Sequence, residues 1–220
     1  MLKVNKKKSE PEEFTKYKSK HKIINWDSFT TEIKQVLKQY LLEEQENSCC
    51  PYCEIEIYLD NSQIEHIKPK DKFPELLIDY DNLLACCLEK KRCGNSKANK
   101  WNGLFINPVI ENPEDYFEYD IKTGKIIPIF KEGNRHEKAK YTIDLLNLND
   151  NRLCEIRKKY IFEFLSYSKN NKYSLNNFPV KFPSLQFFII LVNNFIKYIK
   201  LSKIKFLSSG FKNVLKFFNY

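Results

Sequence analysis

Two pairs of cysteines constrain this chain more than any other feature. Cys50 and Cys53 form a C-x-x-C knuckle in the segment CPYC, and Cys87 and Cys93 follow later in the chain. Four thiolates in two close pairs favour tetrahedral zinc, because each short loop can wrap one face of the ion. The spacing therefore predicts a structural zinc site that closes the intervening segment into a loop.

Other uses of these cysteines stay open at this point. Cys86 adjoins Cys87 and could replace it as a ligand, and Cys49 likewise stands beside Cys50. A disulfide framework is the competing interpretation, but it needs an oxidising compartment. The first residues are basic and lack the apolar segment of a signal peptide, so we expect no export. Buried free thiols are the remaining alternative.

A Glu65-His66 pair lies between the two cysteine pairs. The residues around it alternate as in a short strand, which Pro69 would end, and the basic loop KPKDK follows. An isolated histidine is most often a structural residue. Here a carboxylate, a basic loop and flanking candidate metal ligands surround it, and together they indicate a functional site.

Four segments carry a family resemblance when taken together. CPYCE, IEHIKPK, DYDNLL and CGNSKAN resemble the ββα-metal HNH endonucleases of the cysteine-rich type. The upstream LLEEQENSCCPYCE and the later TGKIIP and TIDLLNLNDNRL are similar to the HNH subunit of Septu-type anti-phage systems, which is also found beside certain retrons. The likeness covers the chain to about residue 165.

The resemblance implies a role for each polar residue of the motif. His66 would be the general base that deprotonates a water molecule for attack on a phosphodiester. Glu65 would bind a single catalytic Mg²⁺ or Mn²⁺ ion. Asn82 would orient the histidine through a hydrogen bond, although an asparagine before an apolar run also suits a plain turn.

The third motif position departs from the family pattern. Gly94 stands where the family usually has His or Asn, so we expect Asn95 to be the second protein ligand of the catalytic cation, with Asn99 as the alternative. Lysines near the motif would contact the nucleic-acid backbone, or else be solvated surface charges. These lysines are Lys68, Lys70 and Lys97.

Charge is unevenly distributed along the chain. The formal net charge is +9, and no acidic residue follows Glu163. Such asymmetry predicts a polyanionic partner, most commonly nucleic acid, although a membrane surface or an acidic protein fits as well. No apolar run is long enough to predict a membrane span.

The chain divides into three parts by pattern. Residues 1–25 form a basic arm, either disordered or laid over a partner, whose end Trp26 anchors. Residues 26–167 form the nuclease domain with helical flanks, and residues 168–220 a linker and basic apolar C-terminal helices. The predicted fold is α+β, a zinc-stapled ββα-metal HNH core flanked by N- and C-terminal helices.

Periodicity predicts the elements of this domain. A helix is predicted to begin at Asp27 or Ser28 and to run to about residue 46. This helix would pack beside the motif. The predicted ββα unit consists of strands at residues 54–59 and 63–67 and a helix at residues 96–101. A hairpin in YFEYDI and IIPIF and two helices, at residues 135–146 and 149–167, follow.

The resulting hypothesis is a metal-dependent endonuclease, with DNA as the favoured substrate and tRNA as a possible one. The resemblance implies an effector subunit of a bacterial, cytoplasmic anti-phage complex. Its partners would be an ATPase subunit of the ABC or structural-maintenance type and, in retron systems, a reverse transcriptase with its msDNA. The alternatives are a non-catalytic zinc-knuckle module that binds nucleic acid and a scaffold that recruits a partner.

Overall fold

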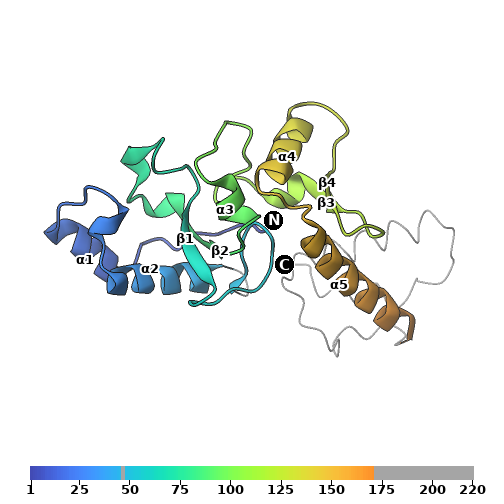
Figure 1. Cartoon of the computed structure of the whole chain (residues 1–220), viewed down its shortest axis with the longest axis horizontal. Coiled ribbons are helices and arrows are strands. Elements are labelled where there is room, and N and C mark those ends of the chain that lie inside the picture. The colour runs from blue at the N-terminus through green and yellow to red at the C-terminus, as the bar shows by residue number, and fades with distance from the viewer. Residues whose placement is uncertain (46–47, 171–220) are drawn as a thin grey trace.

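A computed structural model of the chain describes residues 1–45 and 48–170. Figure 1 shows α1 and α2 at one end of an elongated molecule, α4 and α5 at the other, and β1, β2 and α3 between them. The α-helices are α1 (Glu12–Lys20), α2 (Thr31–Glu44), α3 (Cys93–Lys97), α4 (Asn134–Leu145) and α5 (Asn151–Asn170). The strands are β1 (Ser62–His66), β2 (Leu83–Cys87), β3 (Phe117–Tyr119) and β4 (Ile126–Pro128).

Helix α2 supports one face of the central sheet. Its apolar residues Leu37, Leu41 and Leu42 are buried, and the helix packs on both β2 and β1. The predicted start at Asp27 or Ser28 is wrong, because Trp26–Ser28 form a separate 3-10 turn. The side chains of Asn25 and Ser28 each bond the other's backbone and close that turn, and Thr30 then caps α2.

β1 and β2 form an antiparallel pair that precedes α3 in the chain. His66 pairs with Leu83, and Ser62 pairs with Cys87. The predicted strand at residues 54–59 is wrong: Glu54 has φ 67°, which interrupts an extended run, and this stretch makes only an isolated bridge from Glu56 to Cys49. The strand that pairs with β1 is the apolar LLACC run, which lacks the alternation that a half-buried strand shows.

The short helix after β2 lies earlier than expected. α3 spans Cys93–Lys97, whereas the sequence predicted a helix at residues 96–101. Ala98 follows with φ 46° and ends the helix after less than two turns. The shift matters because Cys93 and Lys97 both belong to α3, which presents Cys93 to a cluster of cysteines and Lys97 to the pocket described below.

The C-terminal part of the described chain confirms the predicted hairpin and two helices. β3 and β4 pair antiparallel, and α4 packs on β4. Arg157 of α5 donates to the carbonyls of Leu148 (2.7 Å) and Gly124 (3.4 Å), which attaches the helix to the hairpin. Gly124 has φ 69°, and a Cβ atom there would lie 2.3 Å from the Cys154 carbonyl oxygen, so only glycine fits.

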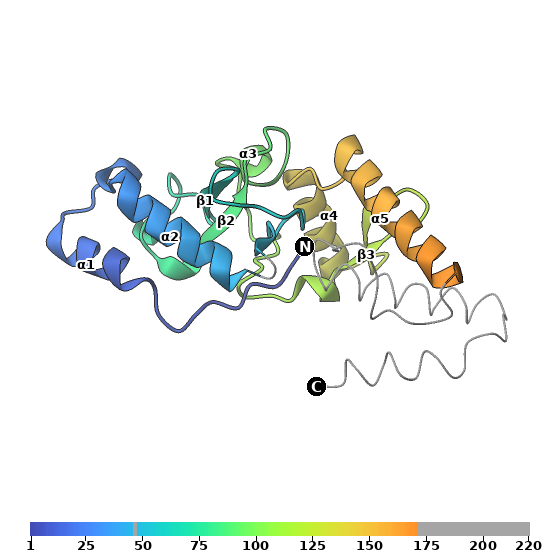
Figure 2. The same cartoon turned by 90° about the horizontal axis from the view of Figure 1, so that it is seen from below.

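The first four residues pack inside the protein, where the sequence predicted a disordered arm as one alternative. Met1, Leu2 and Val4 are at most 2% exposed. The Leu2 amide donates to the Pro51 carbonyl at 2.8 Å, and the Val4 amide donates to the Pro108 carbonyl at 2.9 Å. Figure 2 shows this segment running from the middle of the molecule past α2 to α1. Alternation of apolar residues with lysines gives it one buried face.

The remaining predictions fall at the end of the chain. Residues 168–170 belong to α5, and the rest of the predicted linker and the C-terminal helices, residues 171–220, lie outside the described residues. Within residues 1–45 and 48–170, no helix combines the length and the apolar character needed to cross a membrane.

Candidate active site and metal centre

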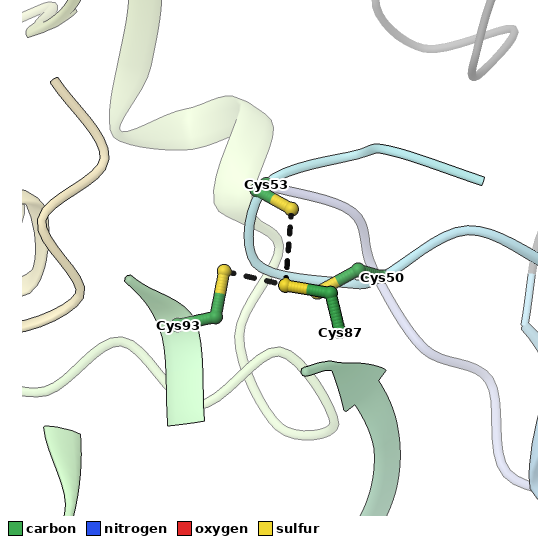
Figure 3. Close-up of side chains that lie close together, drawn as sticks. All are labelled: Cys50, Cys53, Cys87 and Cys93. Atoms are coloured by element: carbon green, nitrogen blue, oxygen red, sulfur yellow. Dashed lines mark hydrogen bonds between the residues drawn. The ribbon is translucent and has the colours of Figure 1, made fainter. Parts of the chain in front are cut away.

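Four buried cysteines converge at the centre of the molecule. The side chains are Cys50 and Cys53 from the knuckle, Cys87 from the end of β2 and Cys93 from the start of α3. Their sulfur atoms all lie within 4.8 Å of one another, and Figure 3 shows them pointing inward. Cys50 Sγ is 3.9 Å from Cys93 Sγ, and Cys53 Sγ is 3.8 Å from Cys87 Sγ. These distances exclude disulfides and leave room for a tetrahedral metal ion.

Backbone geometry explains how the knuckle forms and which neighbouring cysteine faces the cluster. The Glu54 amide donates to the Cys50 carbonyl at 2.8 Å, which closes a tight loop around both sulfurs. Successive strand residues point to opposite faces, so Cys87 enters the cluster while Cys86 faces away. Cys86 instead bonds the Cys87 carbonyl and Gln63. The four cysteines predicted from spacing are the four that meet, and they could hold a metal such as zinc.

The electrostatics of the cluster also favour a bound cation. Burial raises the pKa of the Cys50 and Cys93 thiols well above the ordinary value, whereas hydrogen bonds from the neighbouring cysteines lower the pKa of Cys87. Four thiolates so close together would repel one another in a dry interior. A divalent cation removes that repulsion and holds all four in the thiolate form.

A cavity of about 590 Å³ contains the predicted Glu-His pair. Its walls come from α2, β1, the loop after β1 and α3. Among its described lining residues Glu65 is the one carboxylate, and four lysines accompany it: Lys34, Lys38, Lys70 and Lys97. This charge suits a phosphate-bearing ligand.

His66 is held in an orientation that suits a general base. Its Nε2 lies 3.0 Å from the Leu77 carbonyl oxygen, which can only accept, so Nε2 carries the proton and Nδ1 has a free lone pair. The indole of Trp26 packs edge to face with the imidazole, at 4.7 Å between ring centroids. Burial lowers the pKa of His66, which keeps the ring neutral near pH 7.

Asn82 supports the loop beyond His66, and the prediction that it bonds the imidazole ring is wrong. Its Oδ1 accepts from the Lys68 amide at 2.8 Å, and its Nδ2 donates to the carbonyls of Lys68 (3.1 Å) and Leu76 (3.2 Å). Leu76 precedes Leu77, the residue that binds the histidine. Asn82 therefore fixes the backbone on which the orientation of His66 depends.

Glu65 is buried beside an internal lysine and a glycine. Lys97 Nζ lies 2.9 Å from Glu65 Oε1 and 3.0 Å from the His66 carbonyl oxygen. Burial raises the pKa of Glu65, and Lys97 partly opposes that rise. A Cβ atom at Gly94 would lie 2.6 Å from Glu65 Oε2 and 2.9 Å from Cys86 Sγ. The glycine that departs from the family pattern thus leaves the space that the carboxylate occupies.

The two asparagines considered as ligands of the catalytic cation both line the cavity, and both side chains are hydrogen-bonded to other groups of the protein. Asn95 lines the cavity, but its Nδ2 donates to the Leu88 and Glu89 carbonyls and its Oδ1 accepts from Gln63 at 3.3 Å. Asn99 also lines it and donates to Asp71 Oδ2 at 2.6 Å.

Lys70 is exposed at the cavity, as a nucleic-acid contact requires. Lys68 lies over the rings of Phe73 (5.4 Å) and Trp101 (6.0 Å). Lys97 is 1% exposed, so the prediction that it contacts the substrate backbone is wrong. The burial of Glu65 requires a counter-ion, and Lys97 supplies it.

Sequence reasoning missed the contribution of α2 and of the turn before it. Trp26 was expected to anchor an arm, yet it packs on the catalytic histidine candidate. The helix was expected to pack beside the motif, and its polar face also forms a wall of the cavity. The signal was a polar stripe at helical spacing: Thr31, Lys34, Gln35 and Lys38.

Fold and site together define an α+β protein with a cluster of four cysteines that could hold a metal ion, and with a cationic pocket that a Glu-His pair lines. No protein-family model matches the chain. A candidate HNH endonuclease of retron Vc95 from Vibrio cholerae is 33% identical over 160 residues, which cover 68% of this chain and 76% of the relative. The chain belongs to the HNH-type nucleases associated with bacterial defence systems.

Two further relatives are named as proteins of Septu and retron systems. Septu protein PtuB from Bacillus thuringiensis is 33% identical over 123 residues, 53% of this chain and 42% of that protein. A candidate HNH endonuclease of retron Ec83 from Escherichia coli is 26% identical over 209 residues, 74% of this chain and 80% of the relative. These names support a nuclease role in defence for this chain.

Proposed function

We propose that this protein is a metal-dependent HNH endonuclease that hydrolyses phosphodiester bonds of nucleic acid. The observation that carries the proposal is the orientation of His66, whose Nε2–H donates to the Leu77 carbonyl at 3.0 Å, and burial lowers the pKa of this imidazole. It lies in a lysine-lined cavity with Glu65. In this proposal β1, β2 and α3 are the ββα core of the nuclease.

The proposed reaction begins with proton transfer to His66 Nδ1. A water molecule at Nδ1 loses its proton to the ring as its oxygen attacks phosphorus, and the bond to the leaving oxygen breaks on the opposite side. The leaving oxygen then takes a proton from water, and His66 returns its proton to solvent. Trp26 and the Leu77 carbonyl keep the ring in place during this exchange.

Glu65 is the proposed ligand of a catalytic Mg²⁺ or Mn²⁺ ion. The residues fit such an ion, because Mg²⁺ sites often use one or two carboxylates together with substrate phosphates, and Glu65 is the one carboxylate among the described residues that line the cavity. When bound, the cation supplies charge stabilisation to the leaving oxygen. Asn95 is the proposed second protein ligand, for which its Oδ1 must release Gln63, and Asn99 remains the alternative.

The four-cysteine cluster is proposed to bind structural zinc. Cys50, Cys53, Cys87 and Cys93 match a closed tetrathiolate site, which has no position left for substrate. The ion would join the knuckle, the end of β2 and the start of α3, and the latter two adjoin the proposed active site. Its contribution is therefore to keep the geometry of the Glu65-His66 pair.

The substrate and the partners are proposed from the resemblance to defence nucleases and from the lysines that line the cavity. We propose DNA as the favoured substrate and tRNA as the second candidate. We further propose an effector role in a multi-subunit bacterial defence complex, located in the cytoplasm; the names of the relatives support the defence role. The proposed partners are an ABC or structural-maintenance type ATPase and, in retron systems, a reverse transcriptase with its msDNA.

Cleavage assays test this proposal. Purified protein is incubated with labelled plasmid DNA or bulk tRNA in Mg²⁺ or Mn²⁺, alone and after co-purification with its complex. We expect cation-dependent cutting that His66→Ala abolishes. The matched control is His136→Ala, a histidine half-buried on α4 and absent from the residues that line the cavity. Failure to cut in both preparations, despite bound zinc, would leave a non-catalytic binding module.

A further inference from the structure

Gln63 lies two residues before Glu65 on β1, and both residues line the same cavity. Alternate residues of a strand share one face of the sheet, so the two side chains are neighbours on that face. Across the sheet, Gln63 pairs with Cys86. None of the proposed steps at His66 or Glu65 uses Gln63, so its amide is a polar group of the cavity without a role.

Hydrogen bonds fix which way the Gln63 amide points. The backbone carbonyls of Leu88 and Glu89 lie 3.1 and 3.2 Å from Asn95 Nδ2. Carbonyls only accept, so Asn95 presents its Oδ1 to Gln63. Gln63 must then donate from Nε2, which lies 3.3 Å from Asn95 Oδ1 and 3.6 Å from Cys86 Sγ. Its Oε1 accepts no hydrogen bond from the residues that the structure describes.

The Glu65 carboxylate and the Gln63 amide approach the same sulfur atom. A Cβ atom at Gly94 would lie 2.6 Å from Glu65 Oε2 and 2.9 Å from Cys86 Sγ, so this oxygen and this sulfur come close together at the glycine. The Gln63 amide contacts the same sulfur. Lys97 pairs with the other carboxylate oxygen, Oε1, at 2.9 Å. A cation bound by Glu65 Oε2 would therefore lie near the Gln63 amide.

Gln63 Oε1 suits a divalent cation in chemistry as well as in position. Mg²⁺ and Mn²⁺ prefer oxygen ligands, and an amide carbonyl supplies one without adding negative charge beside Glu65. Asn95 Oδ1 can reach a cation only after Gln63 Nε2 releases it. Gln63 Oε1 needs no such release, because it has no bond to lose among the described residues.

We propose that Gln63 is a protein ligand of the catalytic cation and binds it through Oε1, beside Glu65. This inference rests on the proposed cation site at Glu65, to which it adds a ligand. In this arrangement Asn95 can keep its bond to Gln63 Nε2. It would then orient the amide, as outer-shell groups orient the ligands of other metal sites.

Mn²⁺ binding by the zinc-loaded protein tests this role without a cleavage assay. The electron paramagnetic resonance signal of free Mn²⁺ falls as the ion binds, so a titration with Mn²⁺ alone gives the affinity. Loss of an outer-shell partner typically costs about 10–100-fold in metal affinity, so Gln63→Met, which removes a direct ligand, should cost at least about tenfold. Gln63→Glu should bind Mn²⁺ more tightly than the wild type, because a charged oxygen replaces a neutral one.

Gln63→Glu also separates a ligand from a residue that only supports Asn95. A carboxylate cannot donate to Asn95 Oδ1, so a merely supporting residue would lose affinity in this variant as it does in Gln63→Met. Such a loss would overturn the inference.

The matched controls are Gln35→Met and Gln35→Glu, at an exposed glutamine on the α2 wall of the same cavity. Gln35→Met should keep the wild-type affinity for Mn²⁺. Gln35→Glu measures the effect of an added charge that does not coordinate the ion. A gain in Gln35→Glu as large as that in Gln63→Glu would overturn the inference, because charge alone would explain both.

Glu65→Gln distinguishes failure of this inference from failure of the cation site. Wild-type protein that binds no Mn²⁺, or Glu65→Gln that keeps the wild-type affinity, would refute the proposed cation site and this inference with it. Wild-type binding that Glu65→Gln weakens and Gln63→Met leaves unchanged would overturn the role of Gln63 alone. If Gln63→Met does not fold, Gln63→Glu decides: affinity at or below the wild-type value would overturn the proposal.

Discussion

Lys97 and Glu65 form an ion pair in the interior, with Nζ 2.9 Å from Oε1 and the lysine side chain 1% exposed. The same ammonium donates to the His66 carbonyl at 3.0 Å. One lysine of α3 therefore binds both motif residues at the end of β1. This lysine therefore connects the short helix α3 to strand β1, a connection that the sequence did not predict.

Lys97→Met should destabilise the protein by about 3–5 kcal/mol, because it leaves the Glu65 carboxylate buried without its counter-ion. Urea unfolding of the zinc-loaded protein measures this change. Lys70→Met, at an exposed lysine of the same cavity, is the matched control and should lie within about 0.5 kcal/mol of the wild type. Equal stability of Lys97→Met and Lys70→Met would contradict the pairing.

Gly94→Ala should disrupt the site through a steric clash. The new Cβ would lie 2.6 Å from Glu65 Oε2 and 2.9 Å from Cys86 Sγ, so the carboxylate must move. We expect a stability loss of about 1–3 kcal/mol, the usual cost of overpacking, together with loss of cleavage. Gly103→Ala is the control, since nothing lies within 4 Å of its added atom. Wild-type cleavage by Gly94→Ala would show that Glu65 need not occupy this position.

The pH dependence of cleavage should reflect the lowered pKa of His66. Because burial lowers this pKa below 6.5, the ring stays neutral and able to accept a proton down to a pH below that value. The acid limb of the pH–rate profile should therefore fall below pH 6.5. An NMR titration of the three histidine ring resonances, assigned with His66→Ala, checks the pKa independently. A midpoint above 6.5 would contradict the desolvated environment.

The lowered pKa of His66 should also make the folded protein less stable as the pH falls. As the pH falls below about 6.5, the unfolded state takes up the proton before the folded state does. The free energy of unfolding should therefore decrease from pH 6.5 down to the folded pKa of His66. His66→Gln, which does not titrate, should lose this component of the pH dependence when unfolding is followed across that range.

Asn82→Ala should loosen the loop between β1 and β2. It removes the partner of the Lys68 amide and of the Lys68 and Leu76 carbonyls. We expect a loss of about 1–3 kcal/mol from the unsatisfied buried groups, and slower cleavage because the Leu77 carbonyl no longer fixes His66. Hydrogen exchange of the Lys68 amide reports the loosening, and unchanged protection would show that the side chain is dispensable.

Lys34 and Lys70 should each contribute to nucleic-acid binding through phosphate contacts. For duplex DNA, Lys34→Gln or Lys70→Gln should reduce the slope of log K against log salt by about 0.9, the value for one phosphate contact. Lys16→Gln on α1, 62% exposed and outside the cavity, is the control. Slopes that match the control would exclude these lysines from the binding surface.

The sequence alone determined the elements whose signals are local. The spacing predicted that Cys50, Cys53, Cys87 and Cys93 meet, because a short loop between two cysteines has few ways to wrap one ion, but it left Cys49 and Cys86 as possible replacements. The Glu65-His66 pair, the C-terminal hairpin and the long helices likewise followed from motif and periodicity. Each of these signals lies in residues close together in the chain, although the two cysteine pairs that meet are themselves distant, with 34 positions from Cys53 to Cys87.

Tertiary structure decided where each polar side chain points and what covers it. Lys97 looks like a surface lysine in sequence, but the fold places it against Glu65, and Asn82 bonds a backbone fourteen residues away in place of the imidazole. The basic first residues pack against Pro51 and Pro108, and α2 supplies lysines to the cavity. Which side chains are buried, and which groups they bond, depends on segments that are distant in the chain but adjacent in the fold. A local sequence pattern does not show which distant segments come together.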